Sequence, residues 1–200
     1  MKTIRNISQH AYTYKELERC VRAQSFNHVR MRFIDYHKIP KTGITKDFFF
    51  RDNVNCVAIL LPIVSPQGQL VYHWSGLIKN NYGVEFFESF GLSYSQLEKY
   101  LKESHFTDWL TNNKIPRNHI QLQSKLHHEA TCGSHLICRF CLGIEENNHD
   151  YALSLKKMER HNLSMDDIVT MLTFWNSYPM NMKKHTEKQS RSGGEISFLL

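Results

Sequence analysis

The sequence predicts an α+β fold in which a central, mostly antiparallel sheet packs against helices. The first observation is composition: the chain has 200 residues, of which 41% are hydrophobic, so it can bury a substantial core. The second is that short apolar runs follow one another between about residues 55 and 123. The third is that helix-start patterns stand before and after this region. We therefore expect the sheet near residues 55–123, with a helix that begins at Cys132 packed against it and C-terminal helices completing the other side.

Helix starts are marked by capping-box pairs, in which a hydroxyl side chain precedes an acidic or amide side chain by three positions. Each pair satisfies backbone N–H groups in the first turn of a helix. Apolar residues then follow at helical spacing, and we expect the last of these helices to stop at Pro179. The pairs are Thr13 with Glu16, Ser93 with Gln96, and Ser164 with Asp167.

Strands are predicted where branched apolar residues form short runs bounded by turn residues. His73 and Glu88 fall within a predicted hairpin, but the pattern leaves open whether they face each other or diverge. The runs are an extended piece within 25–43, a buried strand at 53–64, a hairpin of 70–78 and 83–90 joined by 79–82, and a short strand at 119–123.

Composition and charge narrow the class of protein. The longest apolar run, residues 56–64, is too short to cross a bilayer, and the polar start lacks the apolar segment of a secretory signal. We therefore expect a soluble, intracellular protein with no membrane partner. Five cysteines, an odd number, fit a reducing compartment better than a disulfide framework. We expect residues 1–180 to form one domain and residues 181–200 a flexible basic tail.

The stretch HEATCGSHLICRFC, residues 128–141, offers three interpretations of Cys132: a nucleophile, a metal ligand or a buried thiol. A helix N-terminus lowers the pKa of a thiol, and Gly133 allows a substrate to approach closely, which suits a nucleophile. Cys138 and Cys141 have the spacing of zinc ligands. Only one such pair is present, in a half-apolar helical segment, so burial in the core is favoured for both. The nearby histidines are His127, His128, His135 and His149.

Three short motifs follow one another along the chain: HW at residues 73–74, FFESFG at 86–91 and CG at 132–133. In this order and rough spacing they resemble the adenovirus-type cysteine endopeptidases, whose relatives occur in other large DNA viruses and in Maverick/Polinton elements, and more distantly among the SUMO-specific proteases. The resemblance covers about residues 10–145. It implies a papain-like, adenovirus-protease-like cysteine peptidase form of the α+β fold.

The resemblance also implies a catalytic triad for acyl transfer. Cys132 would attack as a thiolate, and His73 would form an ion pair with it and later protonate the leaving amine. Glu88 would orient the imidazole. We prefer Glu88 to Glu85, because strand residues three positions apart point to opposite faces. The alternative for His73 is a hydrogen-bonded strand histidine, and Trp74 is expected to pack behind it or to line the cleft.

Two departures from the family pattern stand out. The family places an oxyanion-hole glutamine six or seven residues before the cysteine, where this chain has Leu126 and Lys125. We assign this role to Gln123, nine residues upstream, although replacement of the donor stays open. Adenovirus proteases are also activated by DNA and by a peptide that forms a disulfide with the enzyme. No cysteine lies between Cys56 and Cys132, so the position of the disulfide partner is empty.

The function implied is the processing of viral precursor polypeptides at Gly-containing sites, in the virion and the host nucleus. We expect a monomer that needs no cofactor, with activation by DNA or a viral peptide as a further possibility. One alternative is a ubiquitin-like-protein isopeptidase of the same fold, although such enzymes commonly have Asp where this chain has Glu88. The other is a non-catalytic basic adaptor that binds nucleic acid or zinc. Selective labelling of one cysteine would favour the protease.

Nonspecific DNA is the other expected partner. The net charge is +6 and the pI is about 9.0, which suggests affinity for polyanions. Basic residues gather near the start and in the tail: Arg19, Arg22, Arg30, Arg32, Lys183, Lys184, Lys188 and Arg191.

Overall fold

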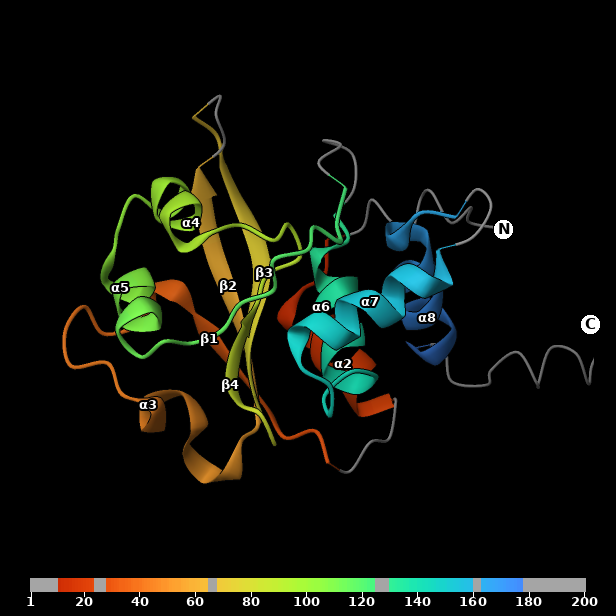
Figure 1. Cartoon of the computed structure of the whole chain (residues 1–200), viewed down its shortest axis with the longest axis horizontal. Coiled ribbons are helices and arrows are strands. Elements are labelled where there is room, and N and C mark those ends of the chain that lie inside the picture. Colours follow the sequence, from red (N-terminus) through yellow and green to blue (C-terminus); the bar gives the residue numbers. More distant parts are fainter. Residues whose placement is uncertain (1–10, 24–27, 65–67, 125–129, 160–162, 178–200) are drawn as a thin grey trace, which may run out of the picture.

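A computed structural model describes residues 11–23, 28–64, 68–124, 130–159 and 163–177 (Figure 1). It is mixed α+β, as predicted, with a four-stranded mixed sheet packed against helices. The strands are β1 (Met31–Asp35), β2 (Cys56–Val64), β3 (Leu70–Asn80) and β4 (Gly83–Phe87). The helices are α2 (Tyr14–Ala23), α3 (Lys46–Phe50), α4 (Tyr94–Leu101), α5 (His105–Asn112), α6 (Cys132–Cys141), α7 (Asn148–Met158) and α8 (Met165–Ser177).

The sheet has the order β1-β2-β3-β4. β1 runs parallel to β2, and the two remaining pairs are antiparallel. β3 pairs with β2 along residues 70–78, whereas β4 pairs only with residues 76–80 of β3. The first half of β3 therefore continues beyond the end of β4, and this mismatch in length determines where the candidate site lies.

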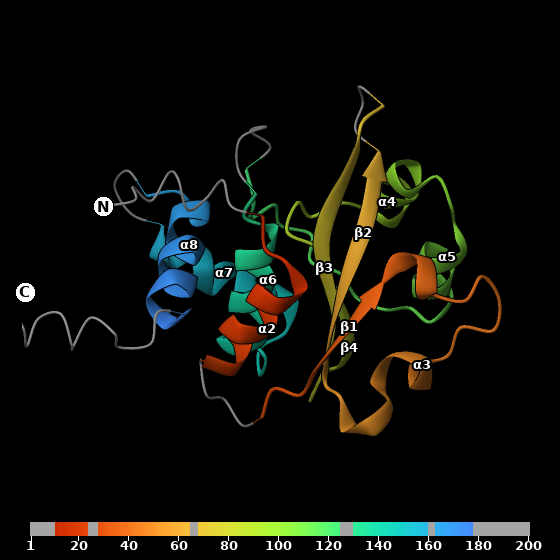
Figure 2. The same cartoon turned by 180° about the vertical axis from the view of Figure 1, so that it is seen from behind.

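Helices cover both faces of the sheet, with α2, α6, α7 and α8 on one side and α3, α4 and α5 on the other (Figures 1 and 2). The prediction that C-terminal helices complete the side opposite the Cys132 helix is therefore wrong, because α8 packs against α6 itself. Alternate residues of β3 enter two separate cores: Trp74 and Ile78 pack with α6, while Leu77 packs with α4 and α5. Among the helices that the structure describes, none is long and apolar enough to cross a membrane.

Helix α6 is buried along its whole length. It approaches β3 closely at Gly76, where an added Cβ atom would lie 2.7 Å from Leu136 Cδ1 and 2.8 Å from Phe140 Cζ. These distances are shorter than normal carbon contacts, so a side chain at position 76 would force the Leu136 and Phe140 side chains to shift. The close approach brings the start of α6 to the exposed half of β3.

The three predicted capping boxes are confirmed at the starts of α2, α4 and α8. For α4, the Ser93 side chain accepts from the Gln96 backbone at 3.2 Å, and the Gln96 side chain accepts from the Ser93 backbone at 2.8 Å. α7 was not predicted, although the Asn147 side chain caps it by accepting from Asp150 N–H at 2.9 Å. Pro179 and the tail at 181–200 lie outside the described residues.

The predicted limits of the sheet need correction. β1 lies within the extended piece predicted at 25–43, but residues 119–123 form no strand. The backbone N–H groups of Leu122 and Gln123 both donate to the Ser89 carbonyl at 2.9 Å. Two successive N–H groups that share one acceptor do not form the alternating hydrogen bonds of a β-strand. In the described structure the preceding chain segment pairs with β4 only at an isolated bridge between Arg117 and Phe86, and β4 ends at Phe87 before it could pair with 119–123.

Replacing Gly76 with alanine tests the approach of α6 to the sheet. We expect Gly76→Ala to lower the free energy of unfolding by about 1–3 kcal/mol, because the new methyl group overpacks the interface. Urea denaturation would measure this loss. Ser75→Ala is the matched control on the opposite face, with a smaller expected loss. Equal stability of Gly76→Ala and the wild type would contradict the close packing of α6 on β3.

Candidate active site

The structure brings three of the predicted site residues together. His73 lies in β3, Glu88 follows the last residue of β4, and Cys132 is the first residue of α6. His73 Nε2 lies 2.7 Å from Glu88 Oε1. The Cys132 sulfur is hydrogen-bonded to the His73 side chain. All three side chains are buried, with 5%, 1% and 8% of the surface of His73, Glu88 and Cys132 accessible.

The sheet register explains why His73 and Glu88 meet. Gly76 pairs with Phe87, so the next residue of the chain, Glu88, falls opposite Ser75. His73 is two positions from Ser75 and therefore shares its face, which makes His73 and Glu88 a diagonal cross-strand pair. This resolves the register that the sequence left open.

Several contacts hold Glu88 in place. Its Oε1 accepts from the Phe90 backbone at 2.8 Å and its Oε2 from the Leu92 backbone at 3.0 Å. Asn118 clamps the Glu88 backbone, accepting its N–H at 2.8 Å and donating to its carbonyl at 2.6 Å. The Phe90 ring stacks on the His73 imidazole with ring centroids 4.9 Å apart. The histidine is thus fixed by a hydrogen bond on its edge and by an aromatic ring on its face.

The electrostatics favour a thiolate–imidazolium pair. Burial alone would raise the pKa of Cys132, but the charge and hydrogen bond of His73 and the backbone N–H groups of Trp74 and Gly133 hold this pKa below its usual value. Burial alone would lower the pKa of His73, but the neighbouring Cys132 and Glu88 raise it to about 10. These opposite shifts favour the charged pair, with the proton on the imidazole and the negative charge on the Cys132 sulfur.

Glu85 occupies a different environment from Glu88, as strand alternation predicts. Its Oε2 accepts from Arg139 Nη2 at 3.1 Å and from the Asn148 backbone at 2.9 Å. Arg139 is completely buried in α6 and lies with its guanidinium 5.2 Å from the centre of the Tyr151 ring. Glu85 therefore pairs with the buried Arg139 near the other end of α6 and makes no contact with His73 in the described structure.

Gln123 contacts Ser89, which follows Glu88 in the chain, but this contact does not establish a catalytic role. It is buried, and its Oε1 accepts from Ser89 Oγ at 2.6 Å. Ser89, the residue after Glu88, therefore contacts the oxygen of the side-chain amide, and the donors of the same amide are the N–H groups of Nε2. The position of Gln123 next to the end of β4 is compatible with an oxyanion-hole donor, and this assignment stays a prediction.

Asp166 is a residue of the site that the sequence analysis missed. Its Oδ2 accepts from the Ser124 backbone at 2.7 Å, and its Oδ1 accepts from the Thr131 hydroxyl and lies 2.9 Å from His135 Nε2. One buried carboxylate from α8 thus ties the residue after Gln123 to the residue before Cys132. The sequence gives no local signal for these contacts, because Asp166 is 42 positions from Ser124. In the sequence it is simply an acidic residue in the first turn of a helix.

The two cysteines with zinc-like spacing are core residues, which confirms the favoured interpretation. Cys138 and Cys141 are 1% and 3% accessible. Burial raises the pKa of Cys141 to about 12 and that of Cys138 further, so both remain thiols at neutral pH. No cluster of three metal-ligating side chains occurs in the described ranges. His127 and His128 lie outside those ranges.

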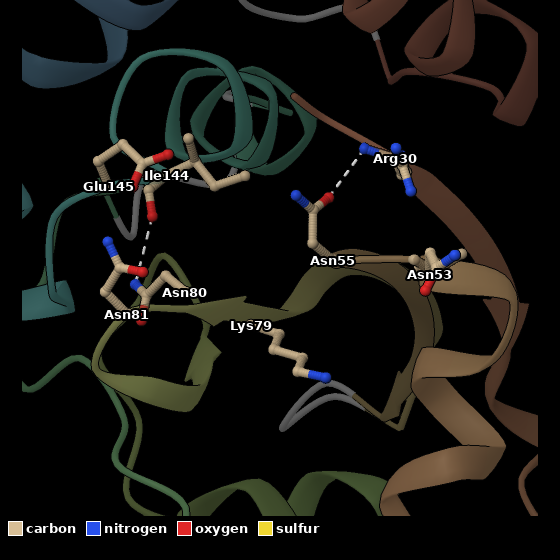
Figure 3. A pocket seen from close by; sticks show the side chains of 9 residues that line it. Arg30, Asn53, Asn55, Lys79, Asn80, Asn81, Ile144 and Glu145 are labelled. Carbon is tan, nitrogen blue, oxygen red and sulfur yellow. Dashed lines mark hydrogen bonds between the residues drawn. The ribbon is translucent and has the colours of Figure 1, made fainter. Parts of the chain in front are cut away.

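A separate polar pocket of about 430 Å³ lies at the other end of β3 (Figure 3). Asn55 and Asn80 already serve the backbone there: Asn55 Oδ1 accepts from Arg30 N–H at 2.8 Å, and Asn80 Nδ2 donates to the Ile144 carbonyl at 3.3 Å. Its lining contains neither cysteine nor histidine. The lining residues are Arg30, Asn53, Val54, Asn55, Lys79, Asn80, Asn81, Ile144 and Glu145.

The basic residues suggested for DNA contact have mixed environments. Arg22 pairs with Glu18 at 2.7 Å on the surface of α2, and Arg32 lies with its guanidinium 5.4 Å from the centre of the Phe48 ring. Arg30 is exposed at the rim of the polar pocket. The tail residues Lys183, Lys184, Lys188 and Arg191 lie outside the described ranges. DNA binding therefore stays a prediction.

The lowered pKa of Cys132 predicts its reactivity with pH. We expect alkylation of Cys132 by iodoacetamide to have a midpoint below the ordinary thiol value of 9.0. His73→Gln should move this midpoint upward, because the imidazolium is lost while burial still disfavours the thiolate. Peptide mapping by mass spectrometry gives the rate at this cysteine alone. His105→Gln in α5 is the control and should not change it; an unchanged midpoint in His73→Gln would contradict the ion pair.

The Asp166 contacts predict an unusual loss of stability. Asp166→Ala should lower the free energy of unfolding by about 3 kcal/mol, because the buried side chains of Thr131 and His135 and the partly buried Ser124 N–H lose a charged acceptor. The matched control is the neighbouring Asp167→Ala, which removes an exposed helix cap and should cost about 1 kcal/mol. Urea denaturation measures the free energy of unfolding of both variants. Equal losses would show that the buried Asp166 network stabilises the fold no more than an exposed helix cap does.

Comparison with known proteins does not assign this site to a family. No family model matches the sequence. A search of curated proteins also gives no match. The roles of His73, Glu88 and Cys132 must therefore be argued from their geometry and chemistry.

Proposed function

We propose that the chain is a cysteine endopeptidase with a Cys-His-Glu triad. The observation that carries the proposal is the contact of Cys132 with His73, and of His73 with Glu88, at the start of a buried helix. A lowered thiol pKa beside a raised imidazole pKa is the protonation pattern that thiol-dependent acyl transfer requires. The nucleophile, the base and its orienting carboxylate all come from the chain, so we propose no cofactor.

In the proposed mechanism, the Cys132 sulfur forms a bond to the scissile carbonyl carbon. The imidazolium of His73 then donates its proton to the leaving amine as the carbon–nitrogen bond breaks, which leaves an acyl-thioester on Cys132. His73, now neutral, accepts a proton from water as the water attacks the thioester carbon. The carbon–sulfur bond then breaks, which releases the carboxylic acid product and restores the Cys132 thiolate beside the His73 imidazolium. Glu88 stabilises the imidazolium in both steps. Backbone N–H groups at the start of α6 and the Gln123 amide are the proposed donors to the oxyanion.

We propose viral precursor polypeptides as the substrates, with cleavage at Gly-containing sites in the virion and the host nucleus. The motif order of the adenovirus-type endopeptidases supports this substrate class. A physical argument supports glycine: only 8% of Cys132 is accessible, so a backbone without side chains next to the scissile bond reaches the sulfur with the least steric hindrance.

The structure bears differently on the two alternative functions, the isopeptidase and the non-catalytic adaptor. An isopeptidase for ubiquitin-like proteins would use the same chemistry, so the triad does not separate it from a viral protease. Cleavage of an isopeptide-linked conjugate in preference to a linear peptide would favour it. The zinc adaptor is less well supported, because Cys138 and Cys141 are buried in the core and the Cys138 thiol donates to the Val169 carbonyl.

Substitutions in the triad test the proposal. Cys132→Ala and His73→Ala should each abolish cleavage of a Gly-rich peptide library, since the nucleophile and the base act as one unit. Glu88→Gln should leave residual activity, about 10²- to 10⁴-fold below the wild type, because it weakens the orientation of the imidazole. Mass spectrometry of the library after incubation identifies the products, and circular dichroism checks that each variant is folded.

Cys138→Ala is the matched control, because it removes a buried sulfur from the same helix without touching the triad. It should retain cleavage. Normal cleavage by Cys132→Ala would show that the assignment is wrong. Gln123→Ala should reduce turnover about 10²-fold, and unchanged turnover would remove Gln123 from the mechanism without affecting the triad.

A further inference from the structure

Among the residues that the structure describes, one edge of β3 has no strand partner beside the candidate nucleophile. Residues 70–78 pair with β2 on one edge, but on the other edge β4 pairs only with residues 76–80. Across the part of the chain that the structure describes, no strand pairs with residues 70–75 on the β4 side. The unpaired edge leads directly to His73 and to the start of α6.

The hydrogen-bond phase of β3 shows which backbone groups face this edge. Lys79 N–H donates to the Asn55 carbonyl at 2.8 Å, toward the β2 side. Trp74 N–H is hydrogen-bonded to the Cys132 sulfur, away from β2. Since successive residues of a strand direct their backbone groups to opposite edges, Tyr72 and Leu70 face the same edge as Trp74. Pro62 of β2 lies opposite Tyr72 and has no N–H. This is consistent with a Tyr72 backbone that forms no hydrogen bond to β2.

The side chains along this edge are unusually apolar for an exposed strand. Leu70, Val71 and Tyr72 are 56%, 45% and 59% accessible, whereas the next residue, His73, is 5% accessible. An unpaired edge with exposed apolar side chains is prone to aggregation and is normally covered or charged. Such a patch on a folded domain marks a place where another chain binds.

We propose that residues 70–72 of β3 bind the substrate segment on the acyl side of the scissile bond as an added β-strand. The inference rests on the proposed peptidase function and names how that site recognises its substrate. The Cys132 sulfur takes the Trp74 N–H that would otherwise bind the next residue of an added strand. A chain paired with Leu70 and Tyr72 is thus directed at the sulfur, because Trp74 is only about 7 Å further along the strand.

Strand addition also predicts a pattern of side-chain preference. Alternate residues of the substrate would lie over Leu70 and Tyr72 on one face, and over Val71 on the other. Apolar residues at alternate positions before the cleavage site should therefore bind best, while affinity comes mainly from backbone hydrogen bonds. An extended, flexible segment is the required substrate, rather than a folded surface.

The test is a titration of the ¹⁵N-labelled full chain, carrying Cys132→Ala, with a capped octapeptide that has leucine at two alternate positions before a Gly-Gly pair. The amide resonances of Leu70 and Tyr72 should shift and gain protection from hydrogen exchange, because their N–H groups form new bonds. The Val71 amide, which faces β2, should not gain protection. Cys132→Ser serves as a second background if the alanine variant is unstable.

A second measurement uses the active chain. Tyr72→Pro removes the outward N–H without removing a bond to β2, so it should lower kcat/KM for the same peptide about tenfold. The rate of Cys132 alkylation by iodoacetamide should stay unchanged, which separates lost docking from a damaged site. Tyr72→Ala, which keeps the N–H, should lose less than Tyr72→Pro.

The outcomes separate the two proposals. If the wild type cleaves the peptide but Leu70 and Tyr72 do not respond in the titration, strand addition is wrong and the peptidase function stands. If both amides respond but cleavage does not depend on Cys132, the edge binds peptides and the peptidase function is wrong. Absence of binding at millimolar peptide, or shifts confined to other elements, overturns the docking proposal.

Discussion

The site depends on how closely helix α6 can approach strand β3. Glycine makes this approach possible on both sides of the helix: at Gly76 in the strand, and at Gly133, where an added Cβ atom would lie 2.8 Å from the Tyr12 ring. Tyr12 is in turn fixed to the sheet, because its carbonyl accepts from Trp74 Nε1 at 2.9 Å. The helix is therefore held between the sheet and the segment before α2, and its first residue meets β3 at the point where β4 has ended. A side chain at either glycine would force the packed side chains of Leu136, Phe140 or Tyr12 to shift.

Packing alone does not explain α6, because this buried helix also carries polar residues that are costly to desolvate. Each is paired with a different neighbour: Cys132 with His73 of β3, His135 with Asp166 of α8, and Arg139 with Glu85 of β4. A shift of the helix along the sheet would leave several of these groups buried without a partner at once, at a cost far larger than that of a small packing change. The polar pairs thus define the position of the helix along its axis, and the glycines define its distance from the sheet.

The parts of this arrangement that the sequence predicted are those with a local cause. Capping boxes such as Ser93 with Gln96 are complete within one helical turn, and the hairpin of β3 and β4 is signalled by two apolar runs with a short polar link. His73, Glu88 and Cys132 were assigned from motif order, which carries no geometry. The register that joins His73 to Glu88, the irregular path of residues 119–123 and the Asp166 contacts depend on chain segments that meet only in the folded state. No periodicity or spacing reports such contacts.

The difference in length between β3 and β4 gives the sheet two roles at the site. Where β4 is absent, the Trp74 N–H that it would have bound donates to the Cys132 sulfur, so a rigid strand helps to stabilise the thiolate. This stabilisation has a chemical limit, because a thiolate with a lower pKa is also a weaker nucleophile. Burial of Cys132 opposes the amides and His73 and keeps the sulfur from becoming too stable an anion. The Trp74 and Gly133 amides and the His73 imidazolium together outweigh this burial, and the net effect favours a thiolate at Cys132.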